Sequence, residues 1–298
     1  MPNSKPTLLV TGAAGQLGRR VVELALAANV GRVIAATRNP EKLADLAARG
    51  ADVRHADFAD AASLREAFAG AQRMLLISTG SLFPPGLRLG QHRAAVAAAV
   101  EAGVRHVCYT SGPAPYPISG GGLIDDHFWT EQALFASPLE WTILRHQIYA
   151  DTLVNAIATA AQSGQLYSSV GTAGMNYVAR EDCARVDAAA LVADWNGRRI
   201  LDVTGPKPVT QDEVAAIGAE LTGRPIRHVT LTREAQRAGM TGAGLPPFLI
   251  DALLAFQLAA SQGYHAITSP AIVDLTGKPP MSVRDFLSAN RAALTPKG

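Results

Sequence analysis

The sequence contains only two cysteines, Cys108 and Cys183, which lie far apart along the chain. Two cysteines cannot form the disulfide framework of a small secreted domain, and these two lack the spacing of metal ligands. We therefore expect neither a disulfide network nor a metal site.

The sequence also lacks a large excess of positive or negative charge, and it lacks long apolar runs. The 27 basic and 25 acidic residues leave a net charge of +2, and the basic residues are scattered. A nucleic-acid-binding or membrane-surface protein would show a clustered basic footprint. The longest apolar stretches, such as residues 94–100, fall well short of the roughly 18 residues of a membrane span. Residues 1–6 are polar and do not resemble a signal peptide, so we expect a soluble cytoplasmic protein.

The composition is that of a folded, enzyme-sized protein. Of its 298 residues, 48% are hydrophobic and 17% are charged, which excludes intrinsic disorder. The length suits one large domain that carries a smaller lobe.

Short apolar runs alternate with helical segments over the first half of the chain. The expected strands are 7–10, 32–37, 51–55, 73–77, 105–109 and 141–144, and the expected helices are 15–28, 40–49, 61–68, 87–102 and 123–135. Strands without polar alternation are buried on both faces, and intervening helices imply parallel pairing through right-handed crossovers. The sequence therefore predicts an α/β fold with a doubly wound parallel sheet of the Rossmann type.

A glycine-rich segment, TGAAGQLG at 11–18, joins the first strand to the first helix. In a dinucleotide site Gly12 permits the tight turn, Gly15 lets the backbone approach a pyrophosphate, and Gly18 lets the helix pack on the strand. The helix N-terminus favours the phosphate charge. An ordinary glycine-rich turn is the alternative, but the position between an apolar strand and a helix favours a cofactor site. The expected contacts are Gly12, Gly15, Gln16, Leu17 and Gly18.

Arg38 follows the second expected strand, where NAD-preferring sites carry an acidic residue for the ribose 2′-hydroxyl. A guanidinium there can bind a 2′-phosphate through paired donors, and Lys42 lies one turn further on. Such a contact of about 1.5–3 kcal/mol corresponds to a roughly 10- to 100-fold preference. A solvated surface arginine is the alternative. We predict that NADP(H) is preferred over NAD(H).

Two further strand ends should contribute to the cofactor site. Asp57 and Phe58 follow the third strand, near the expected adenine. Ser78, Thr79 and Gly80 follow the fourth, where a small loop would pass the nicotinamide ribose. Open α/β sheets bind ligands at these carboxyl ends, although either segment could equally be a local turn.

The pattern is less regular beyond residue 150. We expect a strand at 200–203 near the sheet edge, helices at 209–221 and 246–260, and a strand at 226–230. Segments with proline and glycine at 205–208 and 239–247 set these elements apart as a smaller C-terminal α/β lobe. The predicted NADP-binding domain is 1–150 with about 176–204, and the predicted substrate-binding lobe is 151–175 with 205–298.

Taken together, the chain resembles the NmrA-like branch of the short-chain dehydrogenase/reductases. The resemblance rests on TGAAGQLG (11–18), RNPEK (38–42), AGV (102–104), YTS (109–111), His127-xxx-Glu131, WTILR (141–145) and ARED (179–182). Within this branch it is most similar to the type 2 quinone oxidoreductases and the triphenylmethane and azo dye reductases. The resemblance covers essentially the whole chain and implies an NADPH-dependent reductase.

The proton-donating pair of ordinary short-chain dehydrogenases is missing from this sequence. Those enzymes use a tyrosine and a lysine four residues apart on a helix. None of the six tyrosines has a lysine four positions later, and all five lysines lie outside the expected helix 123–135. A site without that donor suits acceptors such as quinones and cationic triarylmethane dyes. Their products delocalise the charge and can take a proton from water, so the protein need only position the two rings.

No catalytic residue is assigned, and the candidates are His127, Glu131 and Tyr149. His127 and Glu131 lie one turn apart on the helix that usually carries tyrosine and lysine, where they could fix the helix or shuttle a proton. Tyr149 could stack on or hydrogen-bond the acceptor, or pack in the core. Ser111 matches the usual catalytic serine by position.

The segment after the sixth strand should border the nicotinamide, which adds His146, Gln147 and Ile148 to the expected cofactor contacts. In the related family this segment often reads as arginine, then proline or asparagine, then glycine, and here it differs. Phe83 and Phe128, with Tyr149, could line an apolar cleft for the acceptor. Core packing is the alternative for aromatic residues at such positions.

Two other functions fit parts of this pattern. A redox-sensing regulator of the NmrA type would bind NADP without turnover. A reductase of isoflavone-like phenols would usually keep a catalytic lysine in the helix 123–135, which has none. We predict a reductase of small aromatic or quinone acceptors, monomeric or homodimeric, without nucleic-acid or membrane partners.

Overall fold

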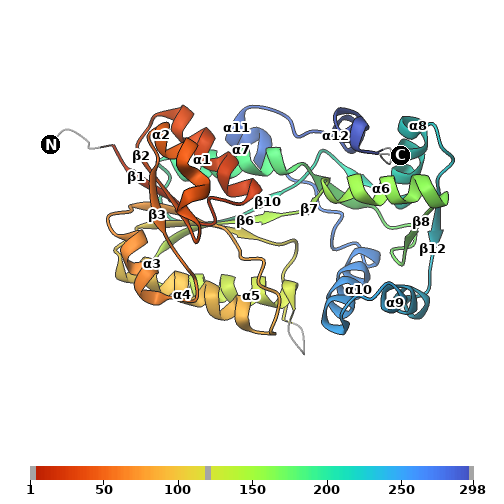
Figure 1. Ribbon diagram of the computed structural model, residues 1–298, viewed down its shortest axis with the longest axis horizontal. Coiled ribbons are helices and arrows are strands. Elements are labelled where there is room, and N and C mark those ends of the chain that lie inside the picture. Colours follow the sequence, from red (N-terminus) through yellow and green to blue (C-terminus); the bar gives the residue numbers. More distant parts are fainter. Residues whose placement is uncertain (1–4, 118–121, 295–298) are drawn as a thin grey trace. The chain divides into compact units, whose positions relative to one another are not determined.

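A computed structural model of the protein describes residues 5–117 and 122–294, which fold into two compact units (Figure 1). The first unit runs to Arg145 and also includes Cys183–Leu201 and Asp274–Gly277. The second unit contains His146–Asp182, Asp202–Val273 and the chain from Lys278 onward.

The first unit is built on a sheet that, within the described residues, has seven strands in the order β10-β6-β5-β4-β1-β2-β3. The strands are β1 (Thr7–Val10), β2 (Arg32–Thr37), β3 (Asp52–His55), β4 (Arg73–Leu76), β5 (His106–Ser111), β6 (Glu140–His146) and β10 (Arg198–Val203). The pairings from β3 to β6 are parallel. The order reverses between β1 and β4, as in a doubly wound sheet. The predicted fold class is confirmed, and the strand expected at 200–203 lies at the sheet edge.

Helices cover both faces of this sheet. They are α1 (Gln16–Ala28), α2 (Ala44–Ala48), α3 (Ala61–Phe68), α4 (Leu87–Glu101), α5 (Leu123–Phe135) and α7 (Arg180–Val192). In Figure 1, α3, α4 and α5 lie below the sheet, whereas α1, α2 and α7 lie above it. The layer between the sheet and α3–α5 forms an apolar core around Phe68, Met74 and Tyr109, each fully buried. Burying apolar surface on both faces is what stabilises this arrangement.

The helix expected at 40–49 is two short elements. A 3₁₀ turn, η1, spans Pro40–Leu43, and α2 follows. Asn39 does not cap the segment, because its side chain makes no capping hydrogen bond. The first turn has 3₁₀ geometry, which is common at the ends of α-helices. Gly50 ends the segment with φ = 99°, a conformation that favours glycine.

The second unit contains two small sheets and several helices. The sheets are β11-β9-β7 and β12-β8. Their strands are β7 (Ile148–Tyr149), β8 (Gln165–Ser168), β9 (Met175–Val178), β11 (Pro208–Val209) and β12 (Arg227–Thr230). The helices are α6 (Thr152–Ser163), α8 (Gln211–Thr222), α9 (Arg233–Gly242), α10 (Pro247–Ser261), α12 (Val283–Ala289) and α13 (Arg291–Leu294), while α11 (Ala271–Thr276) extends into the first unit. This unit has its own core, which includes Ile157, Val214 and Leu287.

Several elements of the second unit were not expected from the sequence. The helix α9 contains one large apolar residue, Met240, and two glycines, so few apolar positions reveal it as a helix. The strands β7 and β11 have two residues each, too few for a pattern. No helix in the described part of the chain is both long enough and apolar enough to cross a bilayer.

Candidate functional site

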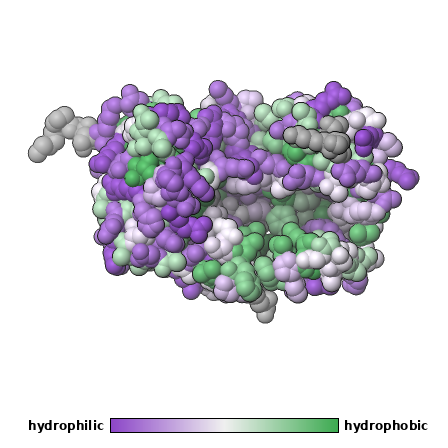
Figure 2. Space-filling model, in the orientation of Figure 1, coloured by the Kyte–Doolittle hydropathy of each residue, from purple (hydrophilic) through white to green (hydrophobic). Residues whose placement is uncertain are grey.

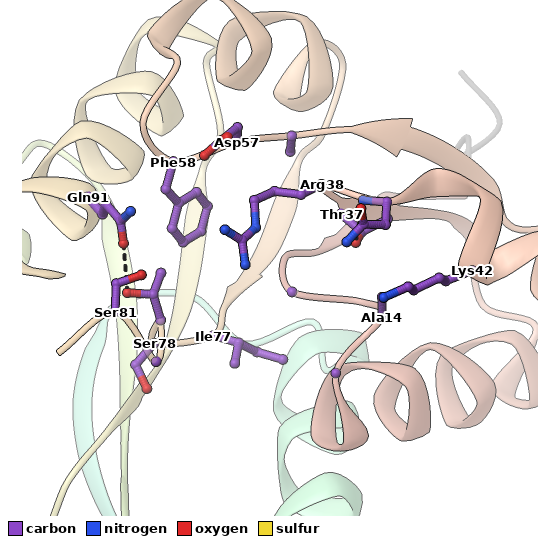
Figure 3. Close-up of a pocket in the computed structure, with 16 residues that line it drawn as sticks. Ala14, Thr37, Arg38, Lys42, Asp57, Phe58, Ile77, Ser78, Ser81 and Gln91 are labelled. Carbon is purple, nitrogen blue, oxygen red and sulfur yellow. Dashed lines mark hydrogen bonds between the residues drawn. The ribbon is translucent and has the colours of Figure 1, made fainter. Parts of the chain in front are cut away.

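A cavity of about 560 Å³ lies at the carboxyl ends of β1, β2, β3 and β4 (Figure 3). This is the position at which the strand order reverses and at which doubly wound sheets bind their ligands. Residues at the ends of these four strands, together with one residue of α4, line it: Gly12, Ala14 and Gly15; Thr37, Arg38, Asn39 and Lys42; Ala56, Asp57 and Phe58; Ile77, Ser78, Thr79, Gly80 and Ser81; and Gln91.

The glycine-rich turn shapes one wall of this cavity. Gly12 has φ = 60°, and its carbonyl accepts a hydrogen bond of 2.9 Å from the Gly15 amide. A Cβ atom on Gly18 would lie 2.4 Å from the Gly12 oxygen, so only glycine lets α1 pack this closely on the turn. The positive end of the α1 dipole therefore faces the cavity, as phosphate binding requires. Of the five expected contacts here, Gly12 and Gly15 line the cavity, whereas Gln16 is exposed outside the lining set and Leu17 and Gly18 are buried.

Two cationic side chains line the cavity at the end of β2. Figure 3 shows Arg38 extending into the cavity with its guanidinium toward Phe58, and Lys42 pointing toward the glycine turn at Ala14. The one carboxylate among the described lining residues is Asp57, whose Oδ1 accepts the Ala59 amide at 2.9 Å. The cavity thus carries two positive charges and one negative charge, and its β2 end presents cations where an NAD-preferring site would present a carboxylate.

The end of β4 forms the opposite wall. Ser78, Thr79 and Gly80 all line the cavity, as does Gln91 from α4. The Thr79 hydroxyl donates to Gln91 Oε1 at 3.0 Å, the contact drawn as a dashed line in Figure 3. The structure therefore brings Gly12, Gly15, Arg38, Asp57, Phe58, Ser78, Thr79 and Gly80 to one cavity.

These residues fit a dinucleotide. Gly15 lines the cavity, and a Cβ atom added to it would lie 3.2 Å from the Gly12 oxygen, closer than an ordinary contact; without one, the backbone there is open to a pyrophosphate. Hydroxyl and amide groups at the β4 end suit a ribose, and the cations at the β2 end suit a phosphate.

Glu131 lies on α5, the helix expected to carry the catalytic lysine of ordinary short-chain dehydrogenases, and both oxygens of its carboxylate have partners. The Ser111 hydroxyl donates to Glu131 Oε1 at 2.7 Å. Arg145 binds both oxygens, with Nε 3.0 Å from Oε1 and Nη2 2.6 Å from Oε2. Glu131 is 1% exposed, so this ion pair is buried on the carboxylate side. Such a paired geometry is typical of a positioning or structural contact rather than of a proton donor.

His127, one turn earlier on α5, is also held from two sides. Its Nε2 lies 3.1 Å from Arg88 Nη2, and its Nδ1 lies 2.9 Å from the Tyr109 hydroxyl. An arginine can only donate, so His127 Nε2 accepts and the neutral ring carries its proton on Nδ1. Burial raises the pKa of the Tyr109 hydroxyl well above its ordinary value. A Cβ atom on Gly112 would lie 2.8 Å from the His127 ring, which explains the glycine after Ser111.

The residues expected after the sixth strand belong to the second unit. Tyr149 is a strand residue of β7, paired with Val178 of β9. Its hydroxyl lies 3.0 Å from His146 Nδ1, and the Arg180 guanidinium lies 5.1 Å from the centre of its ring. Gln147 is buried. A site role for His146, Gln147, Ile148 and Tyr149 stays a prediction.

The other two expected acceptor contacts, Phe83 and Phe128, also lie outside the set that lines the cavity among the described residues. Phe83 is 63% exposed. Phe128 is partly buried and packs edge-to-face on Trp129, with ring centres 5.1 Å apart. Their part in acceptor binding likewise stays a prediction.

Sequence reasoning missed Ser81 and Gln91 in the cavity and a buried polar cluster behind it. That cluster contains Arg88, His92, Tyr109 and His127. A signal was available, because Arg88, Gln91 and His92 share the face of α4 that carries Ala95 and Ala99 toward the core. Polar residues at the core positions of a helical repeat indicate buried hydrogen bonds.

A doubly wound sheet with a glycine turn and a cationic cavity at its switch point defines a dinucleotide-binding α/β protein. The family model described as NAD(P)H-binding matches residues 12–194, and the chain belongs to this family. It is 30% identical to quinone oxidoreductase 2 of Escherichia coli, over 94% of this chain and 97% of that protein. It is 28% identical to the NAD(P)H azoreductase of Xenophilus azovorans, over 96% and 98% of the two chains.

Solved structures agree with this assignment. The quinone oxidoreductase of Escherichia coli complexed with NADPH superposes with a TM-score of 0.87, at 30% identity over 95% of this chain and 99% of that chain. The triphenylmethane reductase of Citrobacter sp. complexed with NADP(H) gives 0.85, also at 30% identity over 95% and 99%. The resemblance drawn from the sequence is confirmed, and the protein is an NAD(P)H-dependent reductase.

Proposed function

We propose that this reductase transfers hydride from NADPH, in preference to NADH, to a quinone or a similarly conjugated aromatic acceptor, without a Tyr–Lys proton donor. When bound, the reduced nicotinamide supplies the hydride. The protein contributes binding, orientation and exclusion of competing reactions. The names of two relatives, a quinone oxidoreductase and an azoreductase, support this acceptor class.

The observation that carries this proposal is that two polar side chains of α5 are held by buried contacts. His127 and Glu131 lie four residues apart on α5, the helix expected to carry tyrosine and lysine in ordinary short-chain dehydrogenases. Both side chains are engaged in buried contacts, His127 with Arg88 and Tyr109 and Glu131 with Ser111 and Arg145. Reduction of a simple ketone needs a proton as the hydride arrives. A conjugated acceptor spreads the charge over its rings and does not.

The chemistry balances without a protein acid. A quinone that accepts a hydride becomes a hydroquinone monoanion, which then takes one proton from water. A cationic triarylmethane dye that accepts a hydride at its central carbon becomes neutral and needs no proton. In both cases NADPH is oxidised to NADP⁺, and the main requirement on the protein is to hold two flat rings in contact.

The preference for NADPH rests on the charges at the end of β2. Arg38 and Lys42 line the cavity there, and no acidic side chain from the β2 loop does so among the described residues. A 2′-phosphate would accept charge-assisted hydrogen bonds from the guanidinium. A 2′-hydroxyl carries no negative charge and would gain less from the same cation.

Replacing Arg38 by alanine is expected to raise the Kd of NADPH roughly 10- to 100-fold, because a charge-assisted contact of about 1.5–3 kcal/mol is lost. The Kd of NADH should change less than about threefold, since NADH lacks the phosphate. Titration of nucleotide fluorescence measures both constants. The control is Arg65→Ala, which removes an exposed arginine of α3 outside the cavity lining. Equal losses for the two nucleotides would contradict the assignment of Arg38.

Steady-state turnover tests the acceptor class. When purified protein is mixed with NADPH and a benzoquinone or a cationic triarylmethane dye, the absorbance of reduced nicotinamide should fall. With a simple ketone it should fall much more slowly. Tight binding of NADPH without turnover of any acceptor would favour a redox-sensing regulator instead. Efficient reduction of ketones would contradict the proposed absence of a proton donor.

A further inference from the structure

Three consecutive amides in the cavity wall, just beyond β4, donate to buried side chains instead of to the sheet. The pairs are Ile77 N–H to Thr11 Oγ1 (2.9 Å), Ser78 N–H to Thr110 Oγ1 (2.9 Å) and Thr79 N–H to His92 Nε2 (3.0 Å). The sheet ladder ends at Leu76, so these three acceptors decide where the backbone runs next.

Thr79 is held on both sides by one helix. Its amide donates to His92 Nε2, and its carbonyl accepts a hydrogen bond of 2.7 Å from Arg88 Nε. Arg88 and His92 are one turn apart on α4, and they are 2% and 0% exposed. The two peptide groups that flank Thr79 are therefore fixed relative to α4.

The bond from Thr79 to His92 requires a neutral imidazole. A backbone amide can only donate, so His92 Nε2 must be unprotonated and Nδ1 must carry the proton. Nδ1 faces Thr130 Oγ1 at 2.9 Å, and the Thr130 hydroxyl donates to the Asp126 carbonyl at 2.6 Å. Burial, aided by the charge of Arg88, lowers the pKa of His92 to about 3, which keeps the ring neutral.

The charge of Arg88 is balanced behind the wall. Its Nη2 donates to His127 Nε2, and its Nη1 lies 3.6 Å from Asp126 Oδ2. Burial lowers the pKa of Arg88 and raises that of Asp126. A buried ion pair is a costly way to stabilise a fold, and hydrophobic residues of similar volume often do so as well. Arg88 also donates a hydrogen bond to the Thr79 carbonyl, which an apolar side chain could not do.

We propose that His92 and Arg88 are positioning residues of the cofactor site, which hold the Thr79 backbone so that the wall at 78–80 is formed before the nicotinamide half of NADPH binds. The inference rests on the proposed function, because it assigns that wall to the nicotinamide side of the cavity. A preformed wall raises affinity by removing the cost of ordering the loop on binding.

Two substitutions of His92 separate positioning from general stability. In His92→Gln the side-chain amide oxygen reaches the place of Nε2 and can accept the Thr79 amide. In His92→Asn the amide reaches only the place of Nδ1, so the bond to Thr79 is lost. Both remove the ring and its packing, so both should lower the melting temperature by similar amounts. We expect His92→Asn to weaken NADPH binding at least about tenfold, whereas His92→Gln stays within about threefold of wild type.

Hydrogen exchange at single amides gives a second readout that does not depend on nucleotide. The Thr79 amide should exchange slowly in wild type and in His92→Gln and much faster in His92→Asn, while the Ser78 amide, held by Thr110, stays protected in all three. Equal NADPH affinities for the two variants, or equal protection of Thr79, would overturn the inference. Wild type that fails to bind NADPH at all would overturn the proposed function itself, which distinguishes the two failures.

Discussion

Alanine at position 18 is expected to lower the free energy of unfolding by about 3 kcal/mol and to weaken NADPH binding at least about tenfold. The added Cβ would lie 2.4 Å from the Gly12 oxygen and 2.9 Å from the Gly12 carbonyl carbon, both of them backbone atoms. No side chain can move to relieve this overlap, so α1 or the turn must shift, and overpacking typically costs about 1–3 kcal/mol, occasionally more. Chemical denaturation and nucleotide titration measure the two losses.

Gly90 provides the matched control. It lies within α4 and is exposed, and an added Cβ would meet no atom within 4 Å. Gly90→Ala should leave stability unchanged or raise it by about 0.5–1 kcal/mol, because alanine is the better helix former. A Gly18→Ala variant as stable as Gly90→Ala would show that α1 does not pack this closely against the glycine turn.

Replacing Arg145 by methionine is expected to lower the free energy of unfolding by about 3 kcal/mol or more. This change leaves the Glu131 carboxylate, which is 1% exposed, without its bidentate cation. An uncompensated buried charge typically costs about 3–5 kcal/mol. The measurement is denaturant unfolding at neutral pH.

A double-mutant cycle shows whether the loss comes from the stranded charge. Arg145→Met combined with Glu131→Gln removes both charges, so it should be more stable than Arg145→Met alone. The control is Arg237→Met, which breaks an ion pair between exposed side chains, Arg237 (45% exposed) and Asp251 (62% exposed). This change should lower the free energy of unfolding by about 1 kcal/mol or less. A double variant less stable than Arg145→Met would contradict this account of Glu131.

The sequence was sufficient to locate most of the dinucleotide-binding half. The helix α5 has the bounds predicted for it, and the strand ends that carry Arg38, Phe58 and Thr79 do meet at one cavity. These features follow from local signals, namely apolar runs, glycines at required turns, and the rule that parallel strands end at one edge. Local pattern therefore predicts the fold and the cofactor pocket together.

The side-chain contacts of Glu131 and the pairing of Tyr149 could not be predicted from local pattern. Nothing in the spacing of Glu131 shows that Ser111 and Arg145, from two other elements, bind its carboxylate. The placement of Tyr149 in β7 depends on pairing with β9, a partner distant in sequence. Side-chain hydrogen bonds between remote elements leave little periodic trace, so their donors and acceptors have to be seen in three dimensions.

The most direct test of the proposed function follows a deuterium atom from the reactive C4 position of labelled NADPH to a cationic triarylmethane dye. We predict that the reduced dye carries one deuterium at its central carbon and that a simple ketone under the same conditions receives almost none. Tight binding of NADPH with no transfer of deuterium to any conjugated acceptor, or transfer to the ketone as fast as to the dye, would contradict the account.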